Sequence, residues 1–229
     1  MIYAISDLHG NYDAYRKALE TIHFSQNDTL YVVGDVIDRG NQSIKILQHM
    51  MKHANIIPIA GNHEYMALTV LTKFHQEITE EFLDSLQTKD FINYQRWMED
   101  GGNQTLKEFH TLSKSQQKDI IHYLSEFSLY EQVDVNNQKY ILVHAGLEPF
   151  DMNKRLEDYQ IHELLFTSPN LEQLYFEDKL VISGHTPTLA YGYKGKIIQK
   201  NNHILIDCGC IYGFNLGIFC LDTKEEFYV

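Results

Sequence analysis

The sequence predicts an α/β fold in which a layered β core is flanked by helices. Short apolar strands alternate with amphipathic helices over the first 60 residues, which is typical of parallel strands joined by helical crossovers. From about 65 to 130, apolar residues recur at helical spacing and no strand is evident, so we expect a helical insertion. Strand-like segments resume near residue 140. We therefore expect a single domain over residues 1–229.

The first part of the chain contains three apolar runs that predict strands, over residues 2–5, 30–33 and 56–59. Apolar residues at helical spacing predict a helix after each of the first two strands: Tyr15, Leu19 and Ile22, then Ile44, Leu47 and Met50. Each strand ends abruptly in polar residues, which are Asp7 and His9, then Asp35, Asp38 and Arg39, then Asn62 and His63.

The second part of the chain repeats the pattern. Strands predicted over 140–143 and 180–182 lead directly into His144 and His185. Asn136-Asn137 predicts the turn of a hairpin. The tail alternates in strand fashion at 197–198, 204–206 and 216–221. Within the insertion, we interpret Trp97 and the neighbouring aromatic residues as a core rather than a platform for a ligand.

Composition argues against several classes of partner. The formal charge is −12 with four arginines and no basic run, which disfavours nucleic acid polymers and anionic membranes. No stretch approaches the roughly 18 apolar residues of a membrane span, and the strand-like start leaves no room for a signal peptide. We expect a cytoplasmic protein without structural disulfides, because its three cysteines are an odd number. Cys208 and Cys210 are interpreted as small buried residues rather than metal ligands.

The five polar clusters are expected to meet in one crevice, because parallel strands of one sheet end at the same edge. Carboxylates, imidazoles and an amide without thiolates favour manganese, iron, cobalt, nickel or zinc over calcium or magnesium. Two such ions about 3.5–4 Å apart can hold a bridging hydroxide as the nucleophile of an in-line displacement. We expect one ion on Asp7 and His9, a second on Asn62, His144 and His185, and Asp35 between the two.

Five motifs occur in a recognisable order between residues 5 and 186: Asp7-Leu-His9-Gly, Gly34-Asp35-Val-Ile-Asp38-Arg39-Gly40, Gly61-Asn62-His63-Glu64, His144-Ala-Gly146 and Gly184-His185. They resemble the signature set of the calcineurin-like metallophosphoesterases. The resemblance is to the phosphoprotein phosphatase branch, which includes bacterial and phage serine/threonine phosphatases and diadenosine tetraphosphatases. The stretch from Trp97 to Leu106 also resembles a segment of the bacterial members.

The resemblance implies a role for each motif residue. Asp7, His9 and a bridging Asp35 would hold the first ion, and Asp35, Asn62, His144 and His185 the second, with manganese the expected metal. His63 would be the general acid for the leaving group, oriented by a hydrogen bond to Asp38. Arg39, assisted by Asn62, would bind the substrate phosphate.

The segment Leu164–Pro169 departs from the family pattern. Phe166 stands where the family has a Trp, Ser168 occupies the position of a second phosphate-binding Arg, and no arginine follows in the sequence. Losing one charge-assisted contact costs about 1.5–3 kcal/mol of phosphate affinity. Arg155 or Lys179 are the candidates to replace it.

The expected function is metal-dependent hydrolysis of phosphate esters. We expect a serine/threonine protein phosphatase that acts on phosphorylated protein, peptide or small phosphate esters. The alternative is a bis(5'-nucleosyl)-tetraphosphatase or another nucleotide phosphoesterase. A non-catalytic phosphate-binding module is disfavoured, because every metal and acid position carries a competent side chain. The sequence leaves the oligomeric state open.

Overall fold

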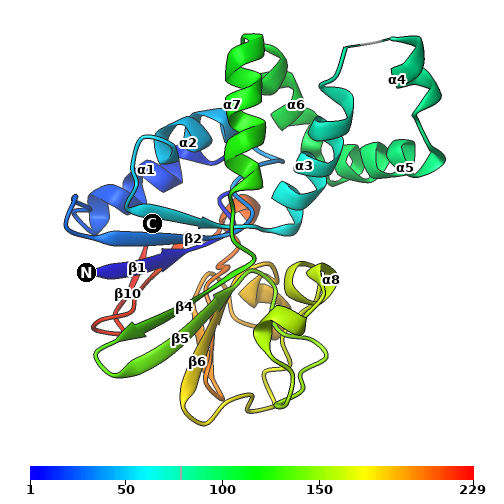
Figure 1. The fold of residues 1–229 in the computed structure, drawn as a ribbon. Coiled ribbons are helices and arrows are strands. Elements are labelled where there is room, and N and C mark those ends of the chain that lie inside the picture. The colour runs from blue at the N-terminus through cyan, green and yellow to red at the C-terminus, as the bar shows by residue number, and fades with distance from the viewer. Residues whose placement is uncertain (78) are drawn as a thin grey trace.

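The computed structural model describes residues 1–77 and 79–229, and its β core consists of two five-stranded sheets (Figure 1). The first sheet has the order β10-β9-β1-β2-β3 and the second the order β4-β5-β6-β8-β7. The first comprises β1 (Ile2–Ile5), β2 (Thr29–Val33), β3 (Ile56–Ile59), β9 (Gly217–Cys220) and β10 (Glu226–Tyr228). The second comprises β4 (Tyr130–Val135), β5 (Gln138–Val143), β6 (Lys179–Ser183), β7 (Ile198–Lys200) and β8 (His203–Leu205).

The two sheets pack face to face because their strands alternate between two apolar environments. Ala4 and Val33 of the first sheet pack with Leu142 and Ile182 of the second. Residues of opposite parity, such as Ile5 and Val32, pack under the helices. The strands are therefore buried on both faces, which explains their continuous apolar runs.

The parallel pairs are β1 with β2, β2 with β3, β5 with β6, and β6 with β8. The expectation that one sheet carries all five polar clusters is wrong in this respect. β1, β2 and β3 belong to one sheet, whereas β5 and β6 belong to the other. Tyr140 and Leu142 of β5 pack against the first sheet, so β5 lies in a second layer rather than beside β3.

Helices α1 (Tyr12–Thr21) and α2 (Ser43–Met50) are the crossovers of the first sheet. The predicted insertion is helical where the structure describes it, and residue 78 lies outside the described residues. Its helices are α3 (Asn62–Phe74), α4 (Glu80–Asp84), α5 (Thr88–Trp97), a π-helical turn (Met98–Gly102), α6 (Asn103–His110) and α7 (Lys114–Ser125). The first turn of α3 already contains Asn62, three residues before the predicted start. A short helix, α8 (Ile161–Leu165), lies beside the second sheet.

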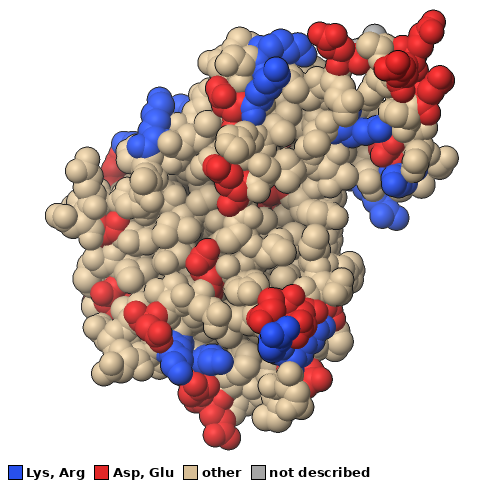
Figure 2. All heavy atoms as spheres, in the orientation of Figure 1, with Lys and Arg blue, Asp and Glu red and all other residues tan. Residues whose placement is uncertain are grey.

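The predicted hairpin is confirmed between β4 and β5, where Val135 pairs with Gln138. Asn136 and Asn137 both have positive φ, at 50° and 64°, as the tight turn requires. Cys208, Cys210 and Cys220 are buried and free. Within the described ranges, no helix has the length and apolar character to cross a membrane. Figure 2 shows charges of both signs scattered over one face, with acidic side chains gathered near α4 and no continuous basic patch.

Candidate active site

The polar clusters predicted at the strand ends lie together where the two sheets meet. Asp7 and His9 follow β1, Asp35 follows β2, Asn62 begins α3, and His144 and His185 follow β5 and β6. The Asn62 amide oxygen lies 3.0 Å from His144 Nε2 and 3.0 Å from His185 Nδ1. His144 Nε2 is 3.3 Å from Asp35 Oδ1. The structure thus brings together residues that are as many as 178 positions apart.

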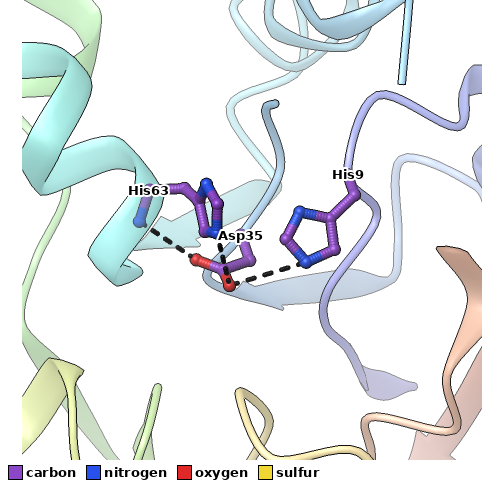
Figure 3. A group of neighbouring side chains, drawn as sticks. All are labelled: His9, Asp35 and His63. Atoms are coloured by element: carbon purple, nitrogen blue, oxygen red, sulfur yellow. Dashed lines mark hydrogen bonds and ion pairs between the residues drawn. The ribbon is translucent and has the colours of Figure 1, made fainter. Parts of the chain in front are cut away.

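Two groups of ligand atoms share the Asp35 carboxylate. One group is His9, Asp35 and His63, and the other is Asp35, His144 and His185, with the ligand atoms of each within 4.8 Å of one another. Figure 3 shows Asp35 between the rings of His9 and His63. Asp35 therefore lies where the sequence placed a bridging ligand.

Two placements differ from the expected ligand set. Asp7 belongs to neither group of ligand atoms, and both of its carboxylate oxygens accept the backbone N–H of His185 at 3.1 Å. His63, expected as an acid, lies close enough to Asp35 and His9 to serve as a ligand. Geometry alone thus leaves two roles open to His63.

The electrostatics of the buried site fit a divalent cation. Burial lowers the pKa of His9 to about 3 and that of His185 to about 4, so both imidazoles are neutral and can donate a lone pair. Burial and the neighbouring Asp207 carboxylate raise the pKa of Asp7 well above its usual value. Buried negative charge beside neutral imidazoles is the environment that a metal ion stabilises.

His144 takes part in the same charge balance. Burial lowers its pKa, but the Asp35 carboxylate outweighs burial and raises the pKa to about 10. A proton shared by His144 and Asp35 thus places positive charge where the surrounding ligand atoms would hold a metal ion. The His144 ring is fixed by its Nδ1, which lies 3.0 Å from the Val33 carbonyl oxygen.

His63 and Asp38 form a buried pair. His63 Nδ1 is 2.8 Å from Asp38 Oδ2, and both side chains are fully buried. Burial lowers the pKa of His63, but the Asp35 carboxylate and the hydrogen bond to Asp38 outweigh it and leave the pKa raised. The other ring nitrogen, Nε2, has no hydrogen-bond partner among the described residues. A protonated imidazole with a free Nε2–H can donate a proton to a bound substrate.

Three residues of the helical insertion hold the loop after β2, which carries Asp38 and Arg39. The Trp97 indole N–H donates to Asp38 Oδ2 at 2.7 Å. The Thr105 hydroxyl accepts the Asp38 backbone N–H, and the Gly101 carbonyl accepts that of Arg39. Trp97 is buried, as predicted, but its indole nitrogen also binds the proposed catalytic dyad. The insertion is therefore one wall of the site.

Arg39 has a carboxylate partner. Its Nη2 donates to Asp100 Oδ1 at 2.9 Å, and its Nη1 lies 3.0 Å from His9 Nε2. The other Asp100 oxygen is 3.5 Å from His63 Nε2. The Asp100 carboxylate thus contacts both Arg39 and His63, the two residues expected from the sequence to act on the substrate. Gly101, with φ 102°, allows this close approach, because a Cβ there would collide with Arg39.

The candidates to replace the second phosphate-binding arginine lie elsewhere. The Arg155 guanidinium is exposed and bound to Asp158 at 2.9 Å. Lys179 begins β6, at the opposite end of that strand from His185, with its ammonium over the Phe176 ring. Ser168 binds Thr186 through their hydroxyl groups, 2.8 Å apart. The Arg155 guanidinium is thus already paired with carboxylates, and Lys179 lies at the far end of its strand from the site.

Sequence reasoning missed the roles of Glu64 and Asp207. The buried Glu64 carboxylate accepts four backbone N–H groups, from Asp35, Val36, Ile37 and Gly61, and so fixes the loop after β2 to the start of α3. Burial, with Asp35 adding to it, raises the pKa of Asp207 to about 6. Asp207 follows the apolar run 204–206, so the strand-end pattern used elsewhere could have found it.

Six of the site residues adopt the left-handed backbone conformation. Their φ values are 55° for Asp7, 43° for His9, 53° for Asp35, 73° for Asp38, 65° for Arg39 and 62° for His185. Backbone hydrogen bonds hold these turns, including His9 N–H to the Asp35 carbonyl and Gly40 N–H to the His9 carbonyl. Gly34 is required beside them, because a Cβ there would lie 2.3 Å from His144 Nδ1.

Comparisons with known proteins identify the family of this chain. The family model described as calcineurin-like phosphoesterase matches residues 1–209. A symmetrical bis(5'-nucleosyl)-tetraphosphatase from Wigglesworthia glossinidia brevipalpis is 27% identical over 75% of this chain, and the match spans 54% of that relative. The asymmetrical bis(5'-nucleosyl)-tetraphosphatase PrpE from Oceanobacillus iheyensis is 26% identical over 96% of this chain and 88% of its own.

Solved structures share the fold. One assigned as a diadenosine tetraphosphatase superposes with a TM-score of 0.69 at 17% identity, covering 100% of this chain and 92% of that one. A protein serine/threonine phosphatase from Saccharomyces cerevisiae superposes with a TM-score of 0.59 at 15% identity, covering 100% of this chain and 79% of that one. At these identities the likeness establishes the architecture alone.

Proposed function

Because the chain belongs to the calcineurin-like phosphoesterase family and is a phosphoesterase hydrolase, we propose that its substrates are dinucleoside polyphosphates. The observation that carries the proposal is that the two relatives described above are both named bis(5'-nucleosyl)-tetraphosphatases. The match to the second covers nearly the whole of both chains. These names favour the alternative over the serine/threonine phosphatase expected first, since the yeast phosphatase supports only the fold.

The metal ligands we propose are those expected from the sequence. Asp7, His9 and Asp35 would hold one divalent ion, and Asp35, Asn62, His144 and His185 the other, with manganese as the proposed metal. Such ions supply Lewis acidity to phosphoryl oxygens and lower the pKa of water. The raised pKa values of Asp7 and Asp207 support this assignment, because burial and neighbouring carboxylates disfavour their ionised forms and a cation would stabilise those forms.

His63 is the proposed acid. As hydroxide bonds to phosphorus, the P–O bond to the leaving group breaks and the Nε2 proton of His63 passes to the leaving oxygen, while Asp38 holds the Nδ1–H and stabilises the imidazolium. Arg39 binds a non-bridging oxygen of the scissile phosphate in place of Asp100. Asn62 contributes beside the ions as ligand and substrate contact. The hydrogen bond to Asp38 and the raised pKa of His63 support the role of acid over that of a metal ligand, because a ligating imidazole must be neutral.

The test compares substrates under one manganese concentration. Purified enzyme is assayed with bis(5'-adenosyl) tetraphosphate, a phosphoserine peptide and para-nitrophenyl phosphate, and an Asp35→Asn variant shows which activity belongs to this site. We expect kcat/KM for the tetraphosphate to exceed that for the peptide by at least about tenfold, or about 1.4 kcal/mol of transition-state binding. A tenfold preference for the peptide would restore the protein-phosphatase interpretation.

A further inference from the structure

A small cavity beside the proposed catalytic residues has no assigned role. Its volume is about 150 Å³, and it is lined by Tyr65, Met66, Thr69, Asn93, Arg96 and Phe166. These residues come from α3, from α5 and from the turn after α8, three elements on one side of the molecule in Figure 1.

The residues that line the cavity are close in the sequence to residues of the site or to residues that contact it. Tyr65 follows His63 by two residues, and Arg96 directly precedes Trp97, which binds Asp38. Phe166 is two residues before Ser168, whose hydroxyl binds Thr186 next to His185. The cavity is therefore formed by segments that also carry or contact residues of the site.

One face of α3 leads from the site into the cavity. Asn62, Tyr65, Met66 and Thr69 have the spacing i, i+3, i+4 and i+7, so they lie on one face of the helix. From Asn62 to Thr69 this face extends on the order of 10 Å along the axis. This face of α3 therefore begins at Asn62, a proposed metal ligand, and leads from there to the cavity.

Arg96 is an uncompensated cation at this position. Among the described residues it makes no hydrogen bond or ion pair, whereas Arg16, Arg39 and Arg155 are each paired with a carboxylate. In a chain of net charge −12, an arginine without a carboxylate partner beside a phosphate site is unusual.

Two aromatic side chains, Tyr65 and Phe166, also line the cavity. Tyr65 and Phe166 pack edge to face, with ring centroids 6.2 Å apart, and Tyr65 is 39% exposed. An exposed aromatic face can stack with a nucleobase, and a guanidinium can bind phosphate or stack on a base.

We infer that this cavity is the subsite for the part of a nucleotide substrate beyond the scissile phosphate. Arg96 binds a distal phosphate of the chain, and Tyr65 and Phe166 contact the terminal base. This inference rests on the proposed function and extends it by naming residues that select a nucleoside polyphosphate over a small phosphomonoester.

The test uses an Arg96→Gln variant, with Arg155→Gln as the matched control at an exposed, carboxylate-paired arginine. Arg96 is exposed, so the substitution leaves the core intact. We expect Arg96→Gln to lower kcat/KM for bis(5'-adenosyl) tetraphosphate about tenfold, mainly through KM. The loss on para-nitrophenyl phosphate should be at least fivefold smaller. A Tyr65→Ala variant should likewise lose more kcat/KM on the tetraphosphate than on para-nitrophenyl phosphate. Arg155→Gln should lower kcat/KM on neither substrate.

A second readout separates this inference from the proposed function. Adenosine tetraphosphate is tested as an inhibitor of para-nitrophenyl phosphate hydrolysis by wild type and by Arg96→Gln. If the dinucleotide is not cleaved but the inhibition constant rises about tenfold in the variant, the subsite stands and the proposed function fails. If the dinucleotide is cleaved and Arg96→Gln affects both substrates equally, the subsite is refuted and the function stands. The subsite is also refuted if hydrolysis of an acidic phosphopeptide depends on Arg96 while adenosine tetraphosphate does not inhibit the enzyme.

Discussion

Replacing Trp97 by phenylalanine tests how the helical insertion supports catalysis. The substitution removes the indole N–H that donates to Asp38 Oδ2 and keeps an aromatic ring in the same buried position. Asp38 is fully buried, and its other oxygen, Oδ1, has no hydrogen-bond partner among the described residues. In the variant, the His63 ring is therefore the only remaining side-chain donor to this carboxylate in the described structure.

The expected cost follows from this geometry. A hydrogen bond to a buried charged group contributes about 1.5–3 kcal/mol, and the smaller ring leaves space that adds to the loss. For a chain of this size, that loss lowers the melting temperature by roughly 3–12 °C. With one of its two donors gone, Asp38 also orients His63 less firmly, so kcat for an alkyl phosphate should fall about tenfold. An aryl phosphate, whose leaving group needs little protonation, should lose much less.

Two measurements check this prediction: urea unfolding of the metal-free protein and kcat for the two classes of ester. The matched control is Phe109→Leu, a buried truncation in α6 that removes apolar volume without a hydrogen bond to the site. If Trp97→Phe destabilises no more than Phe109→Leu and lowers kcat equally for both esters, Trp97 is only a core residue and our reasoning fails.

Four further predictions concern the site and the charge balance. Titration with Mn²⁺ should saturate near two ions per chain, and saturation near one with full activity contradicts the dinuclear mechanism. His63→Ala should lower kcat on alkyl phosphates by roughly 10²–10⁴ and far less on aryl esters, whereas equal losses would indicate a metal-ligand role. Asp100→Asn should lower KM for a phosphomonoester about two- to fivefold, because the partly exposed Arg39 pair competes with substrate; a higher KM would show that Asp100 assists binding. Burial lowers the pKa of His49 to about 4, below the value near 6.5 of the unfolded chain, so stability is lost as pH falls from about 6.5 towards 4. In His49→Gln, urea unfolding of the metal-free protein should show a smaller loss over that range, and parallel curves would refute this assignment.

The sequence located the strands of the site well, because buried strands end where polar ligands begin. β1 and β3 have the predicted bounds, and every predicted metal residue lies at the shared end of the two sheets. A layered core was expected, but the assignment of β5 to the second sheet could not be predicted, since β5 is apolar on both faces and periodicity does not say which sheet it joins.

Contacts between residues far apart in the sequence could not be predicted for a different reason. The helical spacing around Trp97 predicted burial, but the direction of its N–H depends on how α5 packs against the loop after β2. Likewise, Glu64 was visible in its motif, whereas its four backbone partners lie in two segments brought together only by folding. Arg39 was predicted to bind phosphate, and the nearby Asp100 came from a turn 61 residues away.

The left-handed turns at the site bear on how far its loops would depend on a bound ion. Asp7, Asp35 and His185 hold conformations that cost of order 1–3 kcal/mol each, and hydrogen bonds within the protein, including those to the Glu64 carboxylate, offset this cost. Metal binding therefore does not have to order the loops, unlike in small domains that fold only around zinc. A chelator should leave the two sheets and their turns in place, so the protein can lose and regain ions many times without unfolding.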